Sequence, residues 1–170
     1  MIKTNYAKKL CELSEFTQQT YQKMKIEIIT DHKKRFLDLL LLADEQESMI
    51  DRYLERGELF ALYDVNLKSI AVVTHESSGI YELKNLATYK KYQNQGYGRK
   101  LVEYISHFYS SKGTTLWVGT GNVASTIRFY EKCGFVFSHT IPNFFIDHYD
   151  HPIFENEVQL VDMVYLKKEL

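Results

Sequence analysis

The chain has 170 residues, 45% of them hydrophobic and 25% charged, which is the composition of an ordinary globular domain with a substantial core. Its formal net charge of -1 gives no general attraction to nucleic acid or to an anionic membrane. With only two cysteines, no apolar run long enough to span a bilayer and no secretory leader pattern at the N-terminus, we expect a cytoplasmic protein that acts neither on nucleic acid nor in a membrane.

Residues 1–24 carry a thin seam of mostly apolar residues that recur every three or four positions. The pattern predicts a polar helix that packs on the rest of the chain or on a second copy of it, or else a frayed arm. We therefore divide the chain into a helical extension, residues 1–24, and a main domain, residues 25–170.

The main domain is expected to begin with a short strand and two helices. The strand covers residues 26–29, and Asp31 is a plausible N-cap for a helix through Leu42. A second helix spans residues 46–56 and ends at Gly57, a residue type common at helix C-caps. The first helix is expected to turn four apolar residues inward: Phe36, Leu37, Leu40 and Leu41.

Acidic residues gather around the second helix, namely Asp44, Glu45, Glu47 and Asp51. The ordinary interpretation is a solvated face with negative charges placed favourably near a helix N-terminus. The alternative is an acidic rim that selects a cationic substrate.

The remaining chain predicts mostly strands. A turn around Asn66 joins two of them, and a helix over residues 124–133 ends at Gly134. An aromatic and acidic loop, residues 143–152, comes before the last strand. The strands are expected at residues 59–63, 69–75, 80–88, 114–120, 135–139 and 158–166.

The alternation of apolar residues between the two faces is interrupted in the strand over residues 80–88. Tyr81 and Leu83 share one face, but Leu86 lies three residues beyond Leu83. Either Leu86 points to a second buried face or the strand carries a bulge. A bulge would splay this strand from its neighbour and leave backbone N–H groups unpaired over residues 86–88.

A loop with two glycines, Gly96 and Gly98, follows this strand and leads into a helix. Glycine permits a tight turn and close approach of the backbone to a ligand, and the first helical turn offers unpaired N–H groups at the positive end of the helix dipole. Arg99 and Lys100 add positive charge. The helix carries one apolar stripe: Leu101, Val102, Ile105, Phe108 and Tyr109.

This arrangement predicts a phosphate site, although a plain strand-to-helix turn is also possible. It is not a P-loop, because no Gly-Lys-Ser/Thr follows. It is a poor dinucleotide fingerprint, because Leu101 stands where a third glycine or alanine belongs.

Two motifs in order resemble those of the GCN5-related N-acetyltransferase (GNAT) superfamily. They are Gln93-x-x-Gly96-x-Gly98 and Asn122-x-x-Ser125-x-x-x-x-Tyr130-Glu131-Lys132-Cys133-Gly134-Phe135. The resemblance covers roughly residues 26–138 and the final strand. It implies an α/β (α+β type) fold with a mixed, mostly antiparallel sheet of six to seven strands, splayed at its central strands and flanked by helices.

The resemblance also implies acetyl-CoA as co-substrate. The backbone N–H groups of residues 95–99 would cradle its pyrophosphate, and the edge of residues 86–88 would pair with the pantetheine amides. Asn122 would bond the pantetheine arm, and Ser125 the arm or the phosphate. The coenzyme-binding residues implied are Leu86, Ala87, Thr88, Gln93, Asn94, Gln95, Gly96, Tyr97, Gly98, Arg99, Asn122, Ser125 and Tyr130.

Tyr130 is the general acid that the resemblance implies. A phenol with a reference pKa near ~10 is protonated at neutral pH, so it can donate to a departing thiolate. The alternative is core packing, since Tyr130 lies three residues after Ile127.

Glu82 stands where several relatives carry a catalytic glutamate, which makes it the implied general base. A protonated amine cannot attack a thioester, so some group must accept its proton directly or through water. Lys84, two residues on, offers a surface salt bridge as the alternative role for Glu82. The loop residues Asp147, His148 and Asp150 are the other candidates for the base.

The sequence thus predicts an N-acetyltransferase that moves an acetyl group from acetyl-CoA directly to a primary amine, without a metal. The rival is a non-catalytic module that binds or senses acyl-CoA, and a nucleotide-binding regulator comes third. The pair His148-x-x-His151 is a weak metal signal beside bulky aromatics. The residues do not identify the small-molecule or peptide acceptor, and a homodimer is a reasonable expectation.

Overall fold

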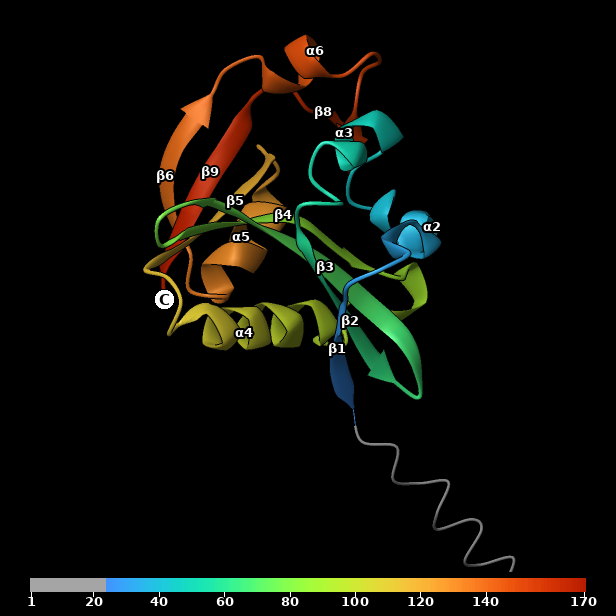
Figure 1. The fold of residues 1–170 in the computed structure, drawn as a ribbon. Helices are drawn as coiled ribbons and strands as arrows, with labels where there is room; N and C mark the ends of the chain where they lie inside the picture. The colour runs from blue at the N-terminus through green and yellow to red at the C-terminus, as the bar shows by residue number, and fades with distance from the viewer. Residues whose placement is uncertain (1–23) are drawn as a thin grey trace, which may run out of the picture.

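The computed structural model describes residues 24–170, and its centre is a seven-stranded sheet in the order β1-β2-β3-β4-β5-β9-β6 (Figure 1). All neighbouring strands are antiparallel except β4 and β5, which are parallel. The helical extension predicted for residues 1–24 lies outside the described residues apart from Met24. The strands are β1 (Lys25–Ile29), β2 (Glu58–Asp64), β3 (Asn66–Ser77), β4 (Ile80–Thr88), β5 (Thr115–Gly121), β6 (Val136–Ile141) and β9 (Met163–Glu169). The mixed, mostly antiparallel sheet expected from the sequence is confirmed.

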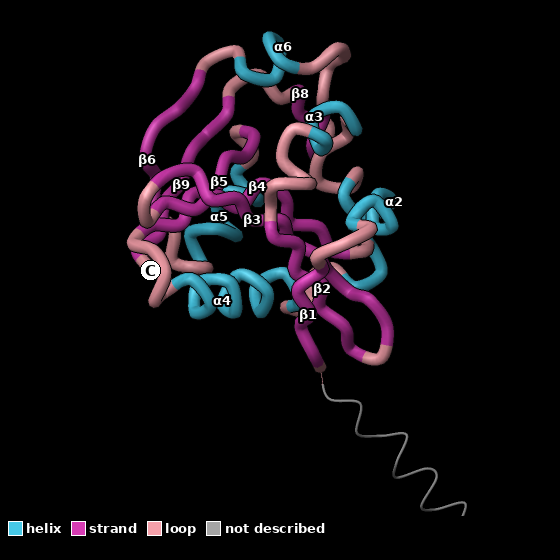
Figure 2. Tube along the Cα trace, in the orientation of Figure 1, coloured by secondary structure: helices cyan, strands magenta, loops and turns pink. Residues whose placement is uncertain are grey.

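Helices cover both faces of this sheet (Figures 1 and 2). On one face, α4 (Tyr97–Tyr109) and α5 (Ala124–Lys132) pack over the larger core, in which the predicted stripe of α4 is buried except for the partly exposed Phe108. On the other face, α2 (Leu37–Leu40) and α3 (Glu47–Asp51) cover a second core. The alternation of β3 serves both, since Val73 lies in the first core and Val72 in the second. Within residues 24–170, no helix is long and apolar enough to cross a lipid bilayer.

The irregularity predicted in β4 is a bulge at Lys84. Val72 of β3 pairs with Asn85, but the next residue, Val73, pairs with Leu83, so Lys84 has no partner across the ladder. Pairing with β5 ends at the same point, because its last register pair is Leu83 with Val118. The two central strands therefore part after Leu83, as a bulge at this position predicts.

The first predicted helix is shorter than expected. The chain forms a 3-10 turn, η1 (Lys33–Phe36), followed by the single turn of α2, and its N-cap is His32 rather than Asp31. The reason is a tertiary contact: the buried Lys33 side chain donates to the carbonyl oxygens of Leu54, Glu55 and Gly57. Because this ammonium must reach into the domain, the segment is held by packing and not by helix periodicity.

The last strand begins at Met163, not at residue 158. Val158 and Gln159 form β8 (Val158–Gln159), which pairs with β7 (Phe154–Glu155) in a separate hairpin. Asn156 and Glu157 both have positive φ, 50° and 66°, as a tight two-residue hairpin turn requires. That local turn accounts for the later start of the strand.

Gly57 follows the turns after α3, which itself ends at Asp51, and it does not adopt the left-handed conformation expected of a C-cap. A Cβ there would lie 2.6 Å from Val72 Cγ1 and 2.9 Å from the Tyr53 carbonyl oxygen. Glycine is therefore required for space.

We expect Gly57→Ala to lower the free energy of unfolding by about 1–3 kcal/mol, because overpacking forces backbone and side-chain shifts. Thermal unfolding by circular dichroism measures this. Gly98→Ala is the matched control, since a Cβ at that position would make only ordinary contacts, the nearest at 3.5 Å. Equal melting temperatures for the two variants would contradict the role of Gly57.

Candidate active site

The glycine loop joins β4 to α4 through a 3-10 turn, η2 (Lys90–Tyr92). Gly96 immediately precedes α4 and has φ 85°, a left-handed conformation that favours glycine. A Cβ on Gly96 would meet nothing within 4 Å, so the residue is required for its backbone angle. The N–H groups of the first turn of α4 lack partners within the helix and lie at the positive end of its dipole. The loop therefore has the backbone geometry of an anion cradle.

Two predicted site residues brace this loop through their side chains. Gln93 Nε2 donates to the carbonyl oxygen of Thr88 at 3.2 Å, and Gln95 Nε2 donates to that of Lys91 at 3.0 Å. Asn94 between them has φ 59°. The amide side chains thus hold the turn, while its backbone N–H groups remain the groups that could meet a phosphate.

The other predicted coenzyme residues surround the same end of the molecule. Arg99 Nε donates to Glu103 at 2.8 Å, so its charge is shared with a carboxylate one helical turn away. Asn122 is exposed directly after β5, and Ser125 lies exposed in the first turn of α5, where its hydroxyl accepts from Asn156 at 3.3 Å.

The parting of β4 and β5 leaves an open strand edge beside the loop. Residues 86–88 pair with β3 on one side, but their groups that point toward β5 have no strand partner. An extended chain with amide groups can pair with such an edge as an added strand does. A phosphate cradle and an open edge thus adjoin along β4, and these residues fit a coenzyme with a diphosphate and an amide-bearing arm.

Tyr130 lies on α5 with its ring in the core, and its hydroxyl has no hydrogen-bond partner within residues 24–170. The residue is 8% exposed, and its ring packs edge-on against Phe129 and Phe135. Among residues 24–170, Asn85 Oδ1 is the one fully enclosed side-chain N or O atom without a hydrogen-bond partner, so the Tyr130 hydroxyl is not sealed off. Burial, and then the nearby Cys133 and Glu155, raises the pKa of Tyr130 well above its usual value. The phenol is therefore protonated over the physiological range and available as a donor.

Glu82 lies on β4 just before the bulge, with its side chain 12% exposed. One carboxylate oxygen, Oε1, accepts from Lys84 Nζ at 2.9 Å and from the Tyr165 hydroxyl at 3.1 Å. The salt bridge weighed as an alternative role is therefore present, but it lies largely buried at the point where β4 leaves β5.

Tyr165 on β9 is a site residue that was not predicted from the sequence. Its ring stacks on His139 with centroids 4.9 Å apart and contacts Trp117 edge-on. Burial, and then the charge of Glu82, raises the pKa of Tyr165, so this hydroxyl remains a donor to the carboxylate. No sequence motif marks it, because its contact with Glu82 crosses from β4 over β5 to β9.

We expect Tyr165→Phe to slow turnover about three- to tenfold, since removing one hydrogen bond to a charged group changes its orientation and basicity. The pH profile of kcat should shift, whereas a purely structural loss would leave its inflection in place. Steady-state kinetics between pH 6 and pH 10 measure this effect. The melting temperature of Tyr165→Phe is the control for folding.

The loop over residues 143–152 contains a short helix, α6 (Phe144–His148). The candidate bases in this loop are exposed and make local contacts: His148 Nδ1 bonds the carbonyl oxygen of Phe144 at 2.8 Å, and Asp150 pairs with His151. Phe145 is buried and anchors the segment in a small cluster of its own. No group of three or more metal-ligating side chains occurs within residues 24–170.

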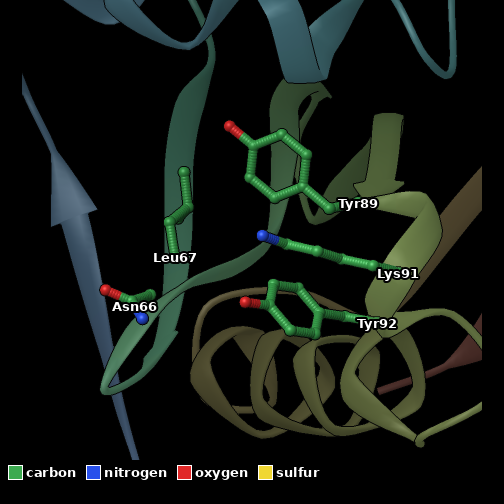
Figure 3. A pocket seen from close by; sticks show the side chains of 5 residues that line it. All are labelled: Asn66, Leu67, Tyr89, Lys91 and Tyr92. Atoms are coloured by element: carbon green, nitrogen blue, oxygen red, sulfur yellow. The ribbon is translucent and has the colours of Figure 1, made fainter.

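A hollow of about 450 Å³ lies outside the predicted site, between the β2–β3 turn and η2 (Figure 3). Lys91 extends between the rings of Tyr89 and Tyr92, while Asn66 and Leu67 line the opposite wall. Hydrogen bonding by Lys68 and Lys91 lowers the pKa of Tyr92. The hollow includes none of the residues predicted to bind coenzyme or to act in catalysis.

The chain is similar to known acetyltransferases in sequence and in fold. Residues 55–137 match the family model described as an acetyltransferase (GNAT) domain. An uncharacterised N-acetyltransferase of Bacillus subtilis, YvbK, is 36% identical over 152 residues, which cover 88% of this chain and 98% of that protein.

Two solved structures share this fold and hold a coenzyme. A GNAT family acetyltransferase from Elizabethkingia anophelis with acetyl-CoA bound has a TM-score of 0.82 and 35% identity, covering 88% of this chain and 99% of that one. A Bacillus subtilis acetyltransferase in complex with CoA has a TM-score of 0.79 and 35% identity, covering 87% and 99%.

Proposed function

Because this chain belongs to the GNAT acetyltransferase family, we propose that it carries the acetyl group of acetyl-CoA directly to a primary amine within a ternary complex. The observation that supports this most strongly is the parting of β4 from β5 after Leu83, with the glycine loop at the far end of the open edge. Relatives of similar sequence bind acetyl-CoA and CoA, which makes acetyl-CoA the donor we propose here.

The orientation of the donor follows from the loop. A diphosphate held by the N–H groups of residues 95–99 fixes one end of the coenzyme at the start of α4. Its arm then runs back along residues 86–88 toward the point where β4 and β5 meet, with Asn122 and Ser125 on the opposite side. The reacting thioester accordingly lies near the bulge at Lys84, and a backbone N–H beside it would polarise the carbonyl.

Three residues of this chain have roles in the proposed transfer. Glu82 accepts the proton of the acceptor ammonium, directly or through water, and the free amine forms a bond to the thioester carbonyl carbon. The carbon–sulfur bond then breaks, and Tyr130 gives its proton to the departing thiolate. Tyr165 orients the Glu82 carboxylate through the 3.1 Å hydrogen bond. The attacking nitrogen loses its second proton to solvent, solvent reprotonates Tyr130, and the products are an acetamide and CoA.

Release of free CoA across a panel of amines tests the transfer. The panel holds amino acids, peptides, aminoglycosides and alkyl amines, and free thiol is quantified while calorimetry measures acetyl-CoA binding. Acetyl-CoA binding together with amine-dependent thiol release is the expected result. Binding without release from any amine would instead favour the rival function, a module that senses acyl-CoA. A homodimer and a cytoplasmic location remain predictions.

A further inference from the structure

The acidic residues around α3 divide into two groups with different surroundings. Lys34 Nζ lies 2.9 Å from Glu47 and 2.8 Å from Asp51, so those two surface carboxylates have a cation between them. Asp44 is half-buried and forms no ion pair with any residue of the range 24–170. Lys34 thus neutralises two carboxylates of the expected acidic rim, Glu45 is exposed, and Asp44 turns inward.

Two tyrosine hydroxyls from different parts of the chain hold the Asp44 carboxylate. Tyr53, in the turns after α3, donates to Oδ2 at 3.3 Å, and Tyr149, directly after α6, donates to Oδ1 at 3.1 Å. Burial raises the pKa of Asp44, and the hydrogen bonds to its carboxylate, one of them from the backbone of Gln46, together with the charge of Lys84 offset that rise only in part. A negative charge held in place by neutral donors is an environment suited to a cation.

Asn85 belongs to the same network, and within residues 24–170 no group donates a hydrogen bond to its side-chain oxygen. Its side chain is 3% exposed, and Nδ2 donates to the Leu40 carbonyl oxygen and to the Tyr53 hydroxyl, both at 3.0 Å. Oδ1 has no partner within the described residues. Buried polar atoms without partners are rare, and each calls for an explanation. Within residues 24–170, this network therefore contains a carboxylate without an ion pair and an amide oxygen without a donor.

The network lies beside the point at which the acetyl group is proposed to react. Asn85 is the residue after the bulge at Lys84, on the face of β4 that α2 and α3 cover, and Glu82 precedes the bulge. Lys84 already pairs with Glu82, so the two together contribute no net charge. Asp44 lies close enough to Lys84 for that ammonium to lower its pKa, and it adds a negative charge outside the Lys84–Glu82 pair.

The segment after α6 closes this network from outside. Besides the hydrogen bond from Tyr149 to Asp44, the backbone N–H of Asp150 donates to Gln46 Oε1 at 3.1 Å. Figure 1 shows α6 and α3 at the same end of the molecule. A ligand that reaches Asp44 must take the place of the Tyr149 hydroxyl, which an ammonium with three donors can do.

We propose that Asp44, assisted by Asn85, binds a second cationic group of the acceptor, so that the acceptor is a diamine or a polyamine. This rests on the proposed acetyl transfer and narrows its substrate. One nitrogen lies near Glu82 and is acetylated, while the other, still protonated, donates to the Asp44 carboxylate and to Asn85 Oδ1. Glu82 and Asn85 stand roughly 7–10 Å apart along the strand, a separation that a chain of several carbons spans.

The test compares 1,5-diaminopentane with pentylamine, which has the same carbon chain and one nitrogen. In the native protein, kcat/KM for acetyl-CoA-dependent CoA release should be at least tenfold higher with the diamine. Asp44→Asn should raise KM for the diamine about 10- to 100-fold, the loss typical of a charge-assisted hydrogen bond, and change pentylamine kinetics little. Calorimetric titration of 1,5-diaminopentane into the CoA-loaded protein should weaken in parallel.

Glu47→Gln is the matched control, because it removes one negative charge from the same segment at an exposed position already paired with Lys34. It should leave both amines unaffected. Equal use of the two amines by the native protein, or equal losses in Asp44→Asn and Glu47→Gln, overturns the role of Asp44. Release of CoA with peptides or amino acids but not with diamines overturns this inference and leaves acetyl transfer standing, whereas no release with any amine removes the proposed function itself.

Discussion

Tyr130→Phe should lower kcat about 100- to 1000-fold while acetyl-CoA affinity stays within about twofold. The lost group is the proton donor for the departing thiolate, and general acid catalysis typically contributes 10²–10⁴-fold. The phenylalanine ring keeps the packing against Phe129 and Phe135, and the hydroxyl makes no hydrogen bond within residues 24–170 that the change would break. The effect should therefore appear in turnover and not in folding or coenzyme binding.

Steady-state kinetics with an acceptor that releases CoA, together with calorimetric titration of acetyl-CoA, separates these effects. The matched control is Tyr104→Phe, which removes a hydroxyl from an exposed tyrosine of α4 and should leave kcat unchanged. Because burial raises the pKa of Tyr130, its proton does not leave within the working range, so the native enzyme should show no fall in kcat at high pH from this residue. Unchanged turnover in Tyr130→Phe would remove it as the acid.

The features that were predicted well from the sequence are those that depend only on residues within one short segment. The break in alternation between Leu83 and Leu86 is local, and the structure places the bulge inside it, at Lys84. The glycine loop and the stripe of α4 are local too, since a left-handed Gly96 and a helical period need no information from the rest of the chain. From these the central strands and the phosphate end of the site could be derived.

What the sequence could not supply depends on contacts between distant segments. Tyr165 reaches Glu82 because of the register that places β9 beside β5, and Tyr149 reaches Asp44 because the segment after α6 folds back over the turn before α3. The helix expected from Asp31 to Leu42 failed for the same reason, since Lys33 is held by three carbonyl oxygens some twenty residues away. The periodicity of apolar residues identifies the buried face of one element and carries no information about contacts between distant segments.

These distant contacts also change how the acidic residues are interpreted. In the sequence, Asp44, Glu45, Glu47 and Asp51 form one cluster, and a solvated face is the ordinary interpretation. In the structure Lys34 forms surface salt bridges with Glu47 and Asp51, and these two residues form the solvated face. Asp44 alone is enclosed with Tyr53 and Tyr149, so one side chain retains the substrate-directed interpretation.

Glu82→Gln should reduce kcat/KM for the acceptor about 100-fold at pH 7 and recover part of that loss as the pH rises. Glutamine has nearly the same shape, and its Oε1 can still accept from Tyr165 and Lys84, so the change removes basicity and preserves the contacts. At high pH an acceptor amine with a pKa near ~10 loses its proton to water, and the need for a protein base falls. The native enzyme, which keeps the Glu82 carboxyl group as a base, should depend less steeply on pH over the same range.

The profile of kcat/KM from pH 6.5 to pH 10.5 decides the question, and acetyl-CoA affinity measured alongside should be unaffected. Glu27→Gln is a close control, because Lys25 and Glu27 also form a pair two residues apart on a strand, with a 2.7 Å contact, but on β1 at the edge of the sheet. It should leave the profile unchanged. A rate loss in Glu82→Gln that is constant at every pH would assign Glu82 to the salt bridge with Lys84, because a lost structural contact is not replaced by hydroxide. A slope near one in the plot of log kcat/KM against pH for Glu82→Gln, steeper than that of the native enzyme, would identify the carboxylate as the group that takes the proton of the amine.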